Sequence, residues 1–600
     1  MKQSSIFLMI ATLFFASCKL NSETKAEATQ PAAPDKDLAA LFVKYHDEEL
    51  QFFPTNATTE GDNRFNDKLP IDFTDAYRDS TKRFYNRYNT LLAAFDKSKL
   101  NEQDQLSYDL FKYNLDIYTE ALKYPDNYMP FNQFVGLTLT MGQLGSGEGA
   151  QPFKTVEDYD NWIKRGTAFN AWADSAIVYF KKGIAANYVL PKALVVKMIP
   201  QMKDLVTTDA TKNLFYGPIK KLPATFSDTD KKRFATAYTK LINEQIVPAY
   251  KKLGDFLQNE YLPKARATSG YSDLPDGKNY YAFLAKQQTT TTKTPDEIYN
   301  LGLSEVKRIR SQMDSVKNAV HFTGDLPAFF EFMKTDKQFM PYKKPTEVLA
   351  AFEKIHQTMQ PQLQKEFIHV PKTKFEIRQT EAFRAASASA EYNQGSADGS
   401  RPGIFYVPIL DATKFNTTSG MESLFLHEAI PGHHYQISLQ QEDTTLPKFR
   451  RFGGQNAYVE GWALYCESLG KELGLYTDPY QYMGALGDEI HRAIRLVVDV
   501  AIHTKGMTRE QAIKYMMDNE AISEQGATAE IERYMAIPGQ ALGYKIGALK
   551  IRELRTKYEK ALGSKFNLGD FHDQILKDGS MPLALLETKM DKWAEVVSGK

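Results

Sequence analysis

Apolar residues recur at steps of three and four along most of this chain, which is the spacing that gathers side chains on one face of a helix. The pattern begins at Leu38 and continues through Leu41, Phe42 and Tyr45. It returns in longer stretches, which predict helices at 77–95, 104–124, 156–185, 228–262 and 295–318. The pattern therefore predicts a fold that is mainly α-helical.

The spacing changes near residue 366, where short runs of apolar and β-branched residues replace the helical pattern. These runs predict four short strands, at 367–370, 374–378, 388–392 and 403–410. Helical spacing then returns and continues to the end of the chain. We therefore expect a helical part at 37–365 and a second part at 366–600 that holds a small sheet, the two forming one compact unit.

The first residues predict a leader rather than part of the fold. Met1-Lys2 is followed by an apolar stretch, Ile6–Ala16, which is too short to span a membrane as a stable helix. Small residues directly before Cys18, and polar residues directly after it, resemble a bacterial lipoprotein signal. We therefore expect residues 1–17 to be a signal peptide, Cys18 to carry a lipid, and residues 18–36 to be a flexible linker to the membrane.

This leader implies a location in the cell envelope of a Gram-negative bacterium. Lys19 follows Cys18, where inner-membrane lipoproteins carry a retention aspartate, so resemblance to Gram-negative lipoproteins favours the outer membrane. Ordinary cleavage, with release of a soluble periplasmic protein, is the alternative. Cys466 is the only other cysteine, so we expect a mature chain without an internal disulfide, stabilised by its core.

The overall charge excludes one class of partner. The chain has 600 residues, of which 74 are basic and 74 are acidic, and it contains no long basic run. A nucleic-acid-binding protein is therefore not expected. The hydrophobic fraction of 42% is enough for one large core or two to three smaller ones. Neither observation predicts an oligomeric state.

Candidate chemistry is concentrated in the segment 424–436, where an apolar run leads into His427 and Glu428 and then into His433 and His434. These are three of only ten histidines in the chain. A His-Glu pair followed by another His on the same helical face is the pattern of zinc peptidases, in which the histidines bind Zn²⁺ and the Glu removes a proton from water. We therefore expect His427 to bind zinc and Glu428 to act as general base. The alternative is that adjacent histidines after Pro-Gly only form a polar helix entry.

The spacing leaves the second histidine ligand open. The usual second ligand lies four residues after the first, but that position is Pro431, which breaks a helix. His434, seven residues on, returns to the same side but lies about 10 Å along an ideal helix. His433, six residues on, fits if Pro431 and Gly432 bulge out of the helix. We favour His433 and keep His434 as the alternative ligand.

A catalytic zinc needs a third protein ligand, and the segment 456–467 offers two carboxylates on an apolar helix. Glu460 follows His433 by 27 residues, enough for a loop and a returning helix, and is the expected third ligand. Glu467, seven residues further, lies on the same face and could fix the tautomer of a ligating histidine. A solvated position is the alternative for Glu460, although its small and aromatic neighbours argue against exposure.

The apolar helix predicted at 489–504 also carries His491, Arg492, Arg495, Asp499 and His503, and the last four of these follow one stripe. Such a stripe is either a paired structural network or a wall that faces substrate. Asp499 is a candidate to support or bind the metal. His503 is a candidate to stabilise the oxyanion of the reaction.

A second segment, 530–547, carries candidates for substrate binding. Arg533 could hold a substrate carboxylate with two hydrogen bonds. Tyr534 or Tyr544 could donate a hydrogen bond to the oxyanion, with ordinary packing as the alternative for each.

Three motifs together resemble a known family. They are His-Glu-Ala-Ile-Pro-Gly-His-His-Tyr-Gln at 427–436, Glu-Gly-Trp-Ala-Leu-Tyr at 460–465 and Pro-Gly-Gln-Ala-Leu-Gly-Tyr-Lys-Ile-Gly at 538–547. The set resembles the domain-of-unknown-function-885 family, and the resemblance covers nearly the whole mature chain. That family is similar in turn to helical gluzincin peptidases such as angiotensin-converting enzyme and the carboxypeptidase Taq type.

The resemblance implies a two-lobed, zincin-like metallopeptidase fold with a small β-sheet beside the active-site helix and a deep channel. The gluzincin motif is His-Glu-x-Gly-His, and matching its Gly-His to Gly432-His433 leaves two extra residues here and supports His433 as the ligand. The gluzincins' third ligand, a glutamate on a downstream helix, matches Glu460, and a tyrosine near their C-terminus matches Tyr544. In zinc peptidases an edge strand next to the motif pairs with the extended substrate.

The expected function is therefore zinc-dependent hydrolysis of peptide bonds in short peptides of the periplasm, because the implied channel would exclude folded proteins. Zn²⁺ held by His427, His433 and Glu460 would polarise the scissile carbonyl, while Glu428 passes a proton from water to the leaving amine. Two other classes stay open. One is a zinc-dependent amidase that acts on cell-wall fragments or other non-peptide amides, and the other is a catalytically inactive, metal-free binding lipoprotein.

Overall fold

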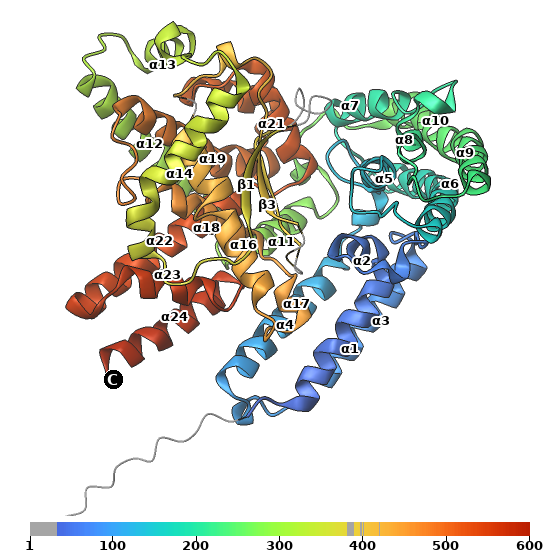
Figure 1. Ribbon diagram of the computed structural model, residues 1–600, viewed down its shortest axis with the longest axis horizontal. Coiled ribbons are helices and arrows are strands. Elements are labelled where there is room, and N and C mark those ends of the chain that lie inside the picture. Colours follow the sequence, from blue (N-terminus) through green and yellow to red (C-terminus); the bar gives the residue numbers. More distant parts are fainter. Residues whose placement is uncertain (1–32, 381–388, 397–398, 400, 419, 600) are drawn as a thin grey trace, which may run out of the picture.

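Helices form most of the structure, as the apolar spacing predicts, and one small sheet interrupts them (Figure 1). The computed structural model describes residues 33–380, 389–396, 399, 401–418 and 420–599. The expected signal peptide, Cys18 and most of the expected linker lie outside these residues. Within the described ranges, no helix has both the length and the apolar character needed to cross a membrane.

The first four helices pack against one another and against the C-terminal part of the chain: α1 (Lys36–Phe52), α2 (Pro54–Glu60), α3 (Asp75–Leu92) and α4 (Glu102–Ala121). Polar residues begin three of them, because the side chains of Asp35, Thr74 and Asn101 accept hydrogen bonds from backbone N–H groups of the first turn. Their apolar faces join a core that extends to Phe449 and Met590.

The next six helices form a group of their own, at the right of Figure 1: α5 (Leu137–Gly145), α6 (Val156–Ala185), α7 (Lys192–Lys203), α8 (Gly217–Lys220), α9 (Asp228–Leu241) and α10 (Val247–Phe256). A π-helical turn at Ile242–Ile246 joins α9 to α10, and another at Leu257–Tyr261 extends α10, so the helical stretch expected at 228–262 is continuous. Trp162 and Trp172 are buried in an aromatic core whose buried members all fall between residues 73 and 261.

The remaining helices carry the candidate residues: α11 (Gly277–Thr289), α12 (Pro295–Ala319), α13 (Leu326–Thr335), α14 (Pro345–Glu366), α15 (Met421–Leu424), α16 (His433–Glu442), α17 (Lys448–Arg451), α18 (Asn456–Glu467), α19 (Pro479–Thr504), α20 (Arg509–Asn519), α21 (Glu524–Ala536), α22 (Leu542–Leu562), α23 (Leu568–Leu576) and α24 (Leu583–Ser598). Their main core is shared with α1–α4. The sequence changes character near residue 366, but the hydrophobic cores divide the chain at other places.

The sheet has three strands in the order β1 (Phe375–Gln379), β3 (Gly403–Val407) and β2 (Glu391–Asn393). β1 is parallel to β3 and β2 is antiparallel to it, so β2 is an edge strand. The ring of Phe405, in β3, packs edge-on against Phe425, two residues before His427. The small sheet expected beside the His-Glu segment is therefore confirmed.

The prediction of a strand at 367–370 is wrong. This segment follows the end of α14 and pairs with no described strand. Phe367 is buried instead, with its ring against those of Tyr435, Trp462 and His572. The apolar run thus reflects burial of an aromatic side chain rather than strand pairing.

Two glycines bring α18 and α22 into backbone contact. A Cβ atom at Gly461 would lie 2.5 Å from the Cα of Gly547, closer than any side chain tolerates. This approach sets the part of α18 that carries Glu460 against the first turns of α22, where Tyr544 lies.

Candidate metal centre

His427 lies where a helix ends. α15 continues into a π-helical turn, Phe425–Ala429, and the chain then leaves the helix through a cis peptide bond before Pro431. A Cβ atom at Gly432 would lie 1.9 Å from the carbonyl oxygen of His427, so only glycine fits this turn. α16 begins directly afterwards at His433. The two extra residues of the motif therefore form a turn between two helices instead of a bulge within one helix.

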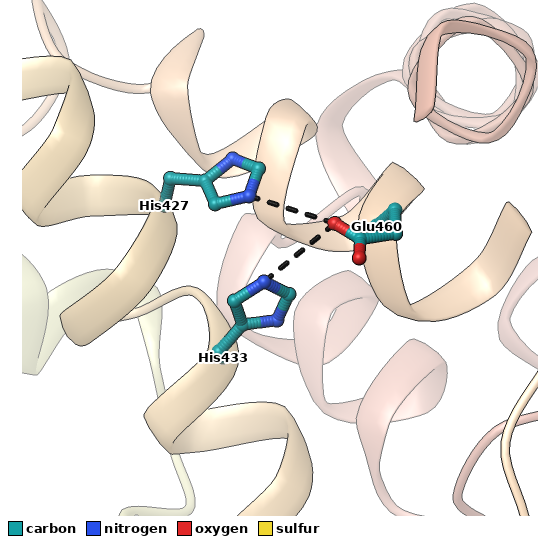
Figure 2. Close-up of side chains that lie close together, drawn as sticks. All are labelled: His427, His433 and Glu460. Carbon is teal, nitrogen blue, oxygen red and sulfur yellow. Dashed lines mark ion pairs between the residues drawn. The ribbon is translucent and has the colours of Figure 1, made fainter. Parts of the chain in front are cut away.

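This turn returns His433 to His427, and the fold adds Glu460 from α18 (Figure 2). One donor atom from each residue lies within 4.8 Å of the other two. The Nε2 atoms of His427 and His433 each lie 3.6 Å from Oε2 of Glu460. Donors about 2.1 Å from a tetrahedral zinc are roughly 3.4 Å apart, so the two distances to Glu460 are close to those around such an ion. Two imidazole nitrogens and one carboxylate oxygen are also a donor set of catalytic zinc sites.

The charges of the centre favour a cation. Burial opposes a charge on His427, but the carboxylates of Glu460 and Glu467 outweigh burial and raise the pKa of His427 to about 10. Burial likewise opposes the charge of Glu460, yet His427 and His433 lower its pKa to about 2. Burial lowers the pKa of His433. The metal-free centre thus holds a proton on His427, a positive charge that a metal ion would replace.

Glu467 supports His427 from the other side of the ring. Its Oε1 lies 2.7 Å from Nδ1 of His427, while Nε2 of the same ring faces Glu460. Both glutamates come from α18, seven residues apart, so they share a face as the spacing predicts. A carboxylate at Nδ1 selects the tautomer that leaves Nε2 free to bind a metal.

Glu428 follows His427 in the chain and contacts the sheet. Its Oε2 accepts a 3.0 Å hydrogen bond from the backbone N–H of Tyr392, in β2. The edge strand is therefore beside the expected general base, and Glu428 remains partly exposed. Tyr392 is a residue that the sequence did not single out. It lies 36 residues before Glu428, and nothing in the strand pattern distinguishes it.

His434 is turned away from this centre. Its Nδ1 lies 2.9 Å from the hydroxyl of Tyr392, and its ring packs 5.0 Å from that of Phe375. Burial lowers its pKa to about 4. The geometry therefore brings His433, and not the alternative His434, to His427 and Glu460.

Two of the expected site residues form hydrogen bonds with other parts of the fold. Nδ1 of His503 accepts a hydrogen bond from the backbone N–H of Tyr271, and Nε2 donates to the carbonyl of Tyr534, so neither nitrogen is left for an oxyanion. Asp499 accepts a 2.6 Å hydrogen bond from the hydroxyl of Tyr281. Both side chains are fully buried. The fold thus occupies both nitrogens of His503, and Asp499 is not among the described residues whose donor atoms converge at the metal centre.

Tyr534 is also used within the fold. Its hydroxyl donates to Glu530 at 2.6 Å and accepts from Nε of Arg495 at 3.0 Å, so it already has two partners within the fold. Tyr544 and Arg533 differ. Nη2 of Arg533 approaches the hydroxyl of Tyr544 at 3.4 Å, and 23% of the Arg533 side chain is exposed. Tyr544 itself is buried, so of these two residues Arg533 is the one with a partly exposed side chain.

A cavity of about 740 Å³ lies between α2 and the elements of the metal centre. Thr59 and Glu60 of α2 line one side of it. Gln436 of α16 and Val459, the residue before Glu460, line the other. The cavity therefore reaches the helices of the metal centre.

A family model described as "Bacterial protein of unknown function (DUF885)" matches residues 54–590. No curated protein matches the chain. A crystal structure of "the putative lipoprotein from Colwellia psychrerythraea" is 28% identical in sequence, with a TM-score of 0.86 over 94% of this chain and 99% of that one. A structure of "a putative lipoprotein of unknown function from Shewanella oneidensis" shares the fold, with 20% identity and a TM-score of 0.72 over 93% of this chain and 100% of that one.

Proposed function

We propose that this chain, which belongs to the bacterial DUF885 family, is a zinc-dependent hydrolase of peptide bonds. The observation that carries the proposal is the convergence of donor atoms from His427, His433 and Glu460 within 4.8 Å, beside Glu428. Structural zinc sites use four protein ligands, whereas catalytic sites use three and keep one position open. Three donors next to a partly exposed carboxylate therefore favour the catalytic kind.

Zinc at these donors would supply Lewis-acid chemistry, polarising a carbonyl group and making water more acidic. Glu428 accepts the proton from water and passes it to the nitrogen of the leaving amine. The N–H of Tyr392 holds the carboxylate of Glu428 in place for this transfer. The hydroxyl of Tyr544 is the proposed donor to the carbonyl oxygen as negative charge develops on it.

Short peptides are the proposed substrates. The cavity of about 740 Å³ is lined in part by α16 and α18, the helices that carry His433 and Glu460. Its volume is that of a small-molecule site, which suits a few residues of extended peptide and not a folded domain. A lipid on Cys18 and a location at the outer membrane remain part of the proposal. The lipid is supported by the similar structure from Colwellia psychrerythraea, described as a "putative lipoprotein", and the outer membrane by Lys19 after Cys18.

The first measurement is the metal content of the purified domain, residues 19–600, by plasma mass spectrometry. About one zinc per chain, with cleavage of short peptides that Glu428→Gln abolishes, supports the proposal. No metal after incubation with zinc overturns it and leaves a binding lipoprotein. Zinc with cleavage of muropeptides or other non-peptide amides, and none of peptides, points to the amidase.

A further inference from the structure

Three arginine side chains contact Tyr544. The guanidinium carbons of Arg492 and Arg495, both on α19, lie 5.4 Å and 4.7 Å from the ring centre. Arg533, on α21, approaches the hydroxyl of the same tyrosine at 3.4 Å. We call Arg492, Arg495 and Arg533 the arginine cluster.

The arginine cluster is short of negative charge. Glu530 forms ion pairs with two members of the cluster, at 3.0 Å from Arg495 and 3.7 Å from Arg533. His491, which lies 3.5 Å from the same carboxylate, competes for it. Arg492 forms no ion pair within the described part of the chain, and its Nε is buried without a hydrogen-bond partner there, as is Nη1 of Arg495. Buried guanidinium nitrogens without an acceptor are costly, so an anionic group supplied by a ligand would stabilise these atoms.

The other nearby carboxylates do not supply this anion. Burial raises the pKa of Asp499 to about 7, and its carboxylate accepts hydrogen bonds from Tyr281 and from the backbone of Gly539. Burial also raises the pKa of Asp488 to about 7, and that carboxylate accepts from Ser423. Glu520 pairs with His491 at 2.7 Å, so among the described residues Glu530 is the carboxylate that lies within 4 Å of the guanidinium groups of the cluster.

The arginine cluster lies beside the metal centre. Nη2 of Arg533 donates to the side chain of Gln540 at 2.8 Å, and the backbone carbonyl of Gln540 accepts from Asn456 at 2.8 Å. Asn456 begins α18, one helical turn before Glu460. From α19, the charge of Arg492 contributes to the lowered pKa of Glu460. An anion bound by the cluster would therefore lie close to a carbonyl group at the metal.

We propose that the arginine cluster binds the terminal carboxylate of the substrate, so that the enzyme acts near the carboxyl end of peptides. This inference rests on the proposed function, because it uses the same site. Arginine is suited to the role, since its planar group forms paired hydrogen bonds with a carboxylate. Arg492 and Arg533 are the members that bind it, because Glu530 already occupies Arg495 at 3.0 Å.

The test compares N-acetyl-trialanine with its C-terminal amide. Binding of each to the Glu428→Gln chain, with and without zinc, is measured by calorimetry. The free carboxylate is expected to bind at least about tenfold more tightly than the amide, the scale of a hydrogen bond to a charged group. The preference should fall below about threefold in Arg492→Gln and Arg533→Gln. Arg552→Gln is the matched control. It removes the same charge from α22 beside Glu489 and should keep the preference.

The outcomes separate this inference from the proposed function. Equal binding of acid and amide overturns the inference, as does no binding of either or a preference that survives both arginine substitutions. The chain could bind the free carboxylate more tightly than the amide and yet hold no zinc and cleave no peptide. That result overturns the proposed hydrolase and still supports the carboxylate site. Cleavage of acid and amide at equal rates, with zinc present, leaves the hydrolase and removes the carboxylate site.

Discussion

The imidazole rings of His427 and His433 stand at 89° to each other, with their centroids 4.9 Å apart. Each ring thus directs its Nε2 toward Glu460 from a different side, as the ligands of a tetrahedral ion do. A continuous helix could not produce this pair, because six residues advance the chain to another face. The relationship depends on the turn at Pro431 and Gly432.

Replacing either of these histidines is expected to abolish zinc binding. His427→Ala and His433→Ala each remove one of three donors, so zinc should fall from about one per chain to near zero in plasma mass spectrometry. His434→Ala is the matched control and should keep its zinc, because that ring contacts Tyr392 and Phe375. Retention of zinc by His433→Ala, with loss from His434→Ala, would reverse the ligand assignment.

Glu428→Gln is expected to keep zinc and lose turnover. The amide cannot accept the proton from water, so kcat should fall by about 100- to 10,000-fold on any peptide that the enzyme cleaves. Steady-state kinetics at equal zinc content is the measurement. Glu353→Gln, at an exposed position of α14, makes the same change away from the site and should leave kcat unaltered. A variant within a few-fold of the parent would mean that another group accepts the proton.

Glu467→Gln is expected to weaken zinc binding without removing it. The substitution keeps an oxygen at Nδ1 of His427 but removes the charge that makes the ring a better donor, so the Kd for zinc should rise about 10- to 100-fold. Competition with a chromophoric chelator measures the change. Glu472→Gln neutralises a nearby glutamate that pairs with Arg555 and should leave the Kd unchanged. The supporting role would be disproved by equal affinities in the two variants.

Zinc affinity is expected to rise with pH. The pKa of His427 without metal is about 10, so below that pH the ring must lose a proton before it can bind zinc. His433 has a lowered pKa and is already neutral near pH 7, so it adds no second proton. The Kd should therefore fall about tenfold for each unit of pH, or roughly 100-fold between about pH 7 and 9. Chelator competition measures the Kd for zinc at both pH values. Equal Kd values would mean that His427 is not a ligand.

Gly461→Ala is expected to destabilise the fold. The added Cβ would lie 2.5 Å from the Cα of Gly547 and force α18 away from α22, at a cost of about 1–3 kcal/mol. Thermal unfolding should show a lower Tm, and zinc affinity should fall as Glu460 moves. Gly487→Ala provides the contrast. It lies within α19 with nothing within 4 Å of its Cβ position, so helix propensity alone should leave Tm equal or higher. Equal Tm values in the two variants would contradict the close contact.

Local patterns were sufficient for most helices and for the candidate ligands. Periodic apolar positions show which face of a helix will be buried, whatever packs against it, and this is why 228–262 was predicted as helical. The seven-residue spacing of Glu460 and Glu467 places both on one face in the same way. The run at 367–370 shows the limit, because a short apolar segment does not reveal whether its side chains meet a strand or a helix.

Contacts between distant parts of the chain decided which of the candidate residues lie together in one site. A stripe of polar residues shows which face of α19 is polar but not which part of the chain packs against that face. His503, for example, contacts the backbone of Tyr271, 232 residues away. The backbone N–H of Tyr392, in the edge strand, donates to Glu428, and the spacing of residues along the chain could not predict this contact. His433 rather than His434 joins His427 because Gly432 permits a turn that no side chain would fit. Spacing along the chain orders side chains within one element, whereas the position of one element against another depends on which surfaces exclude water together.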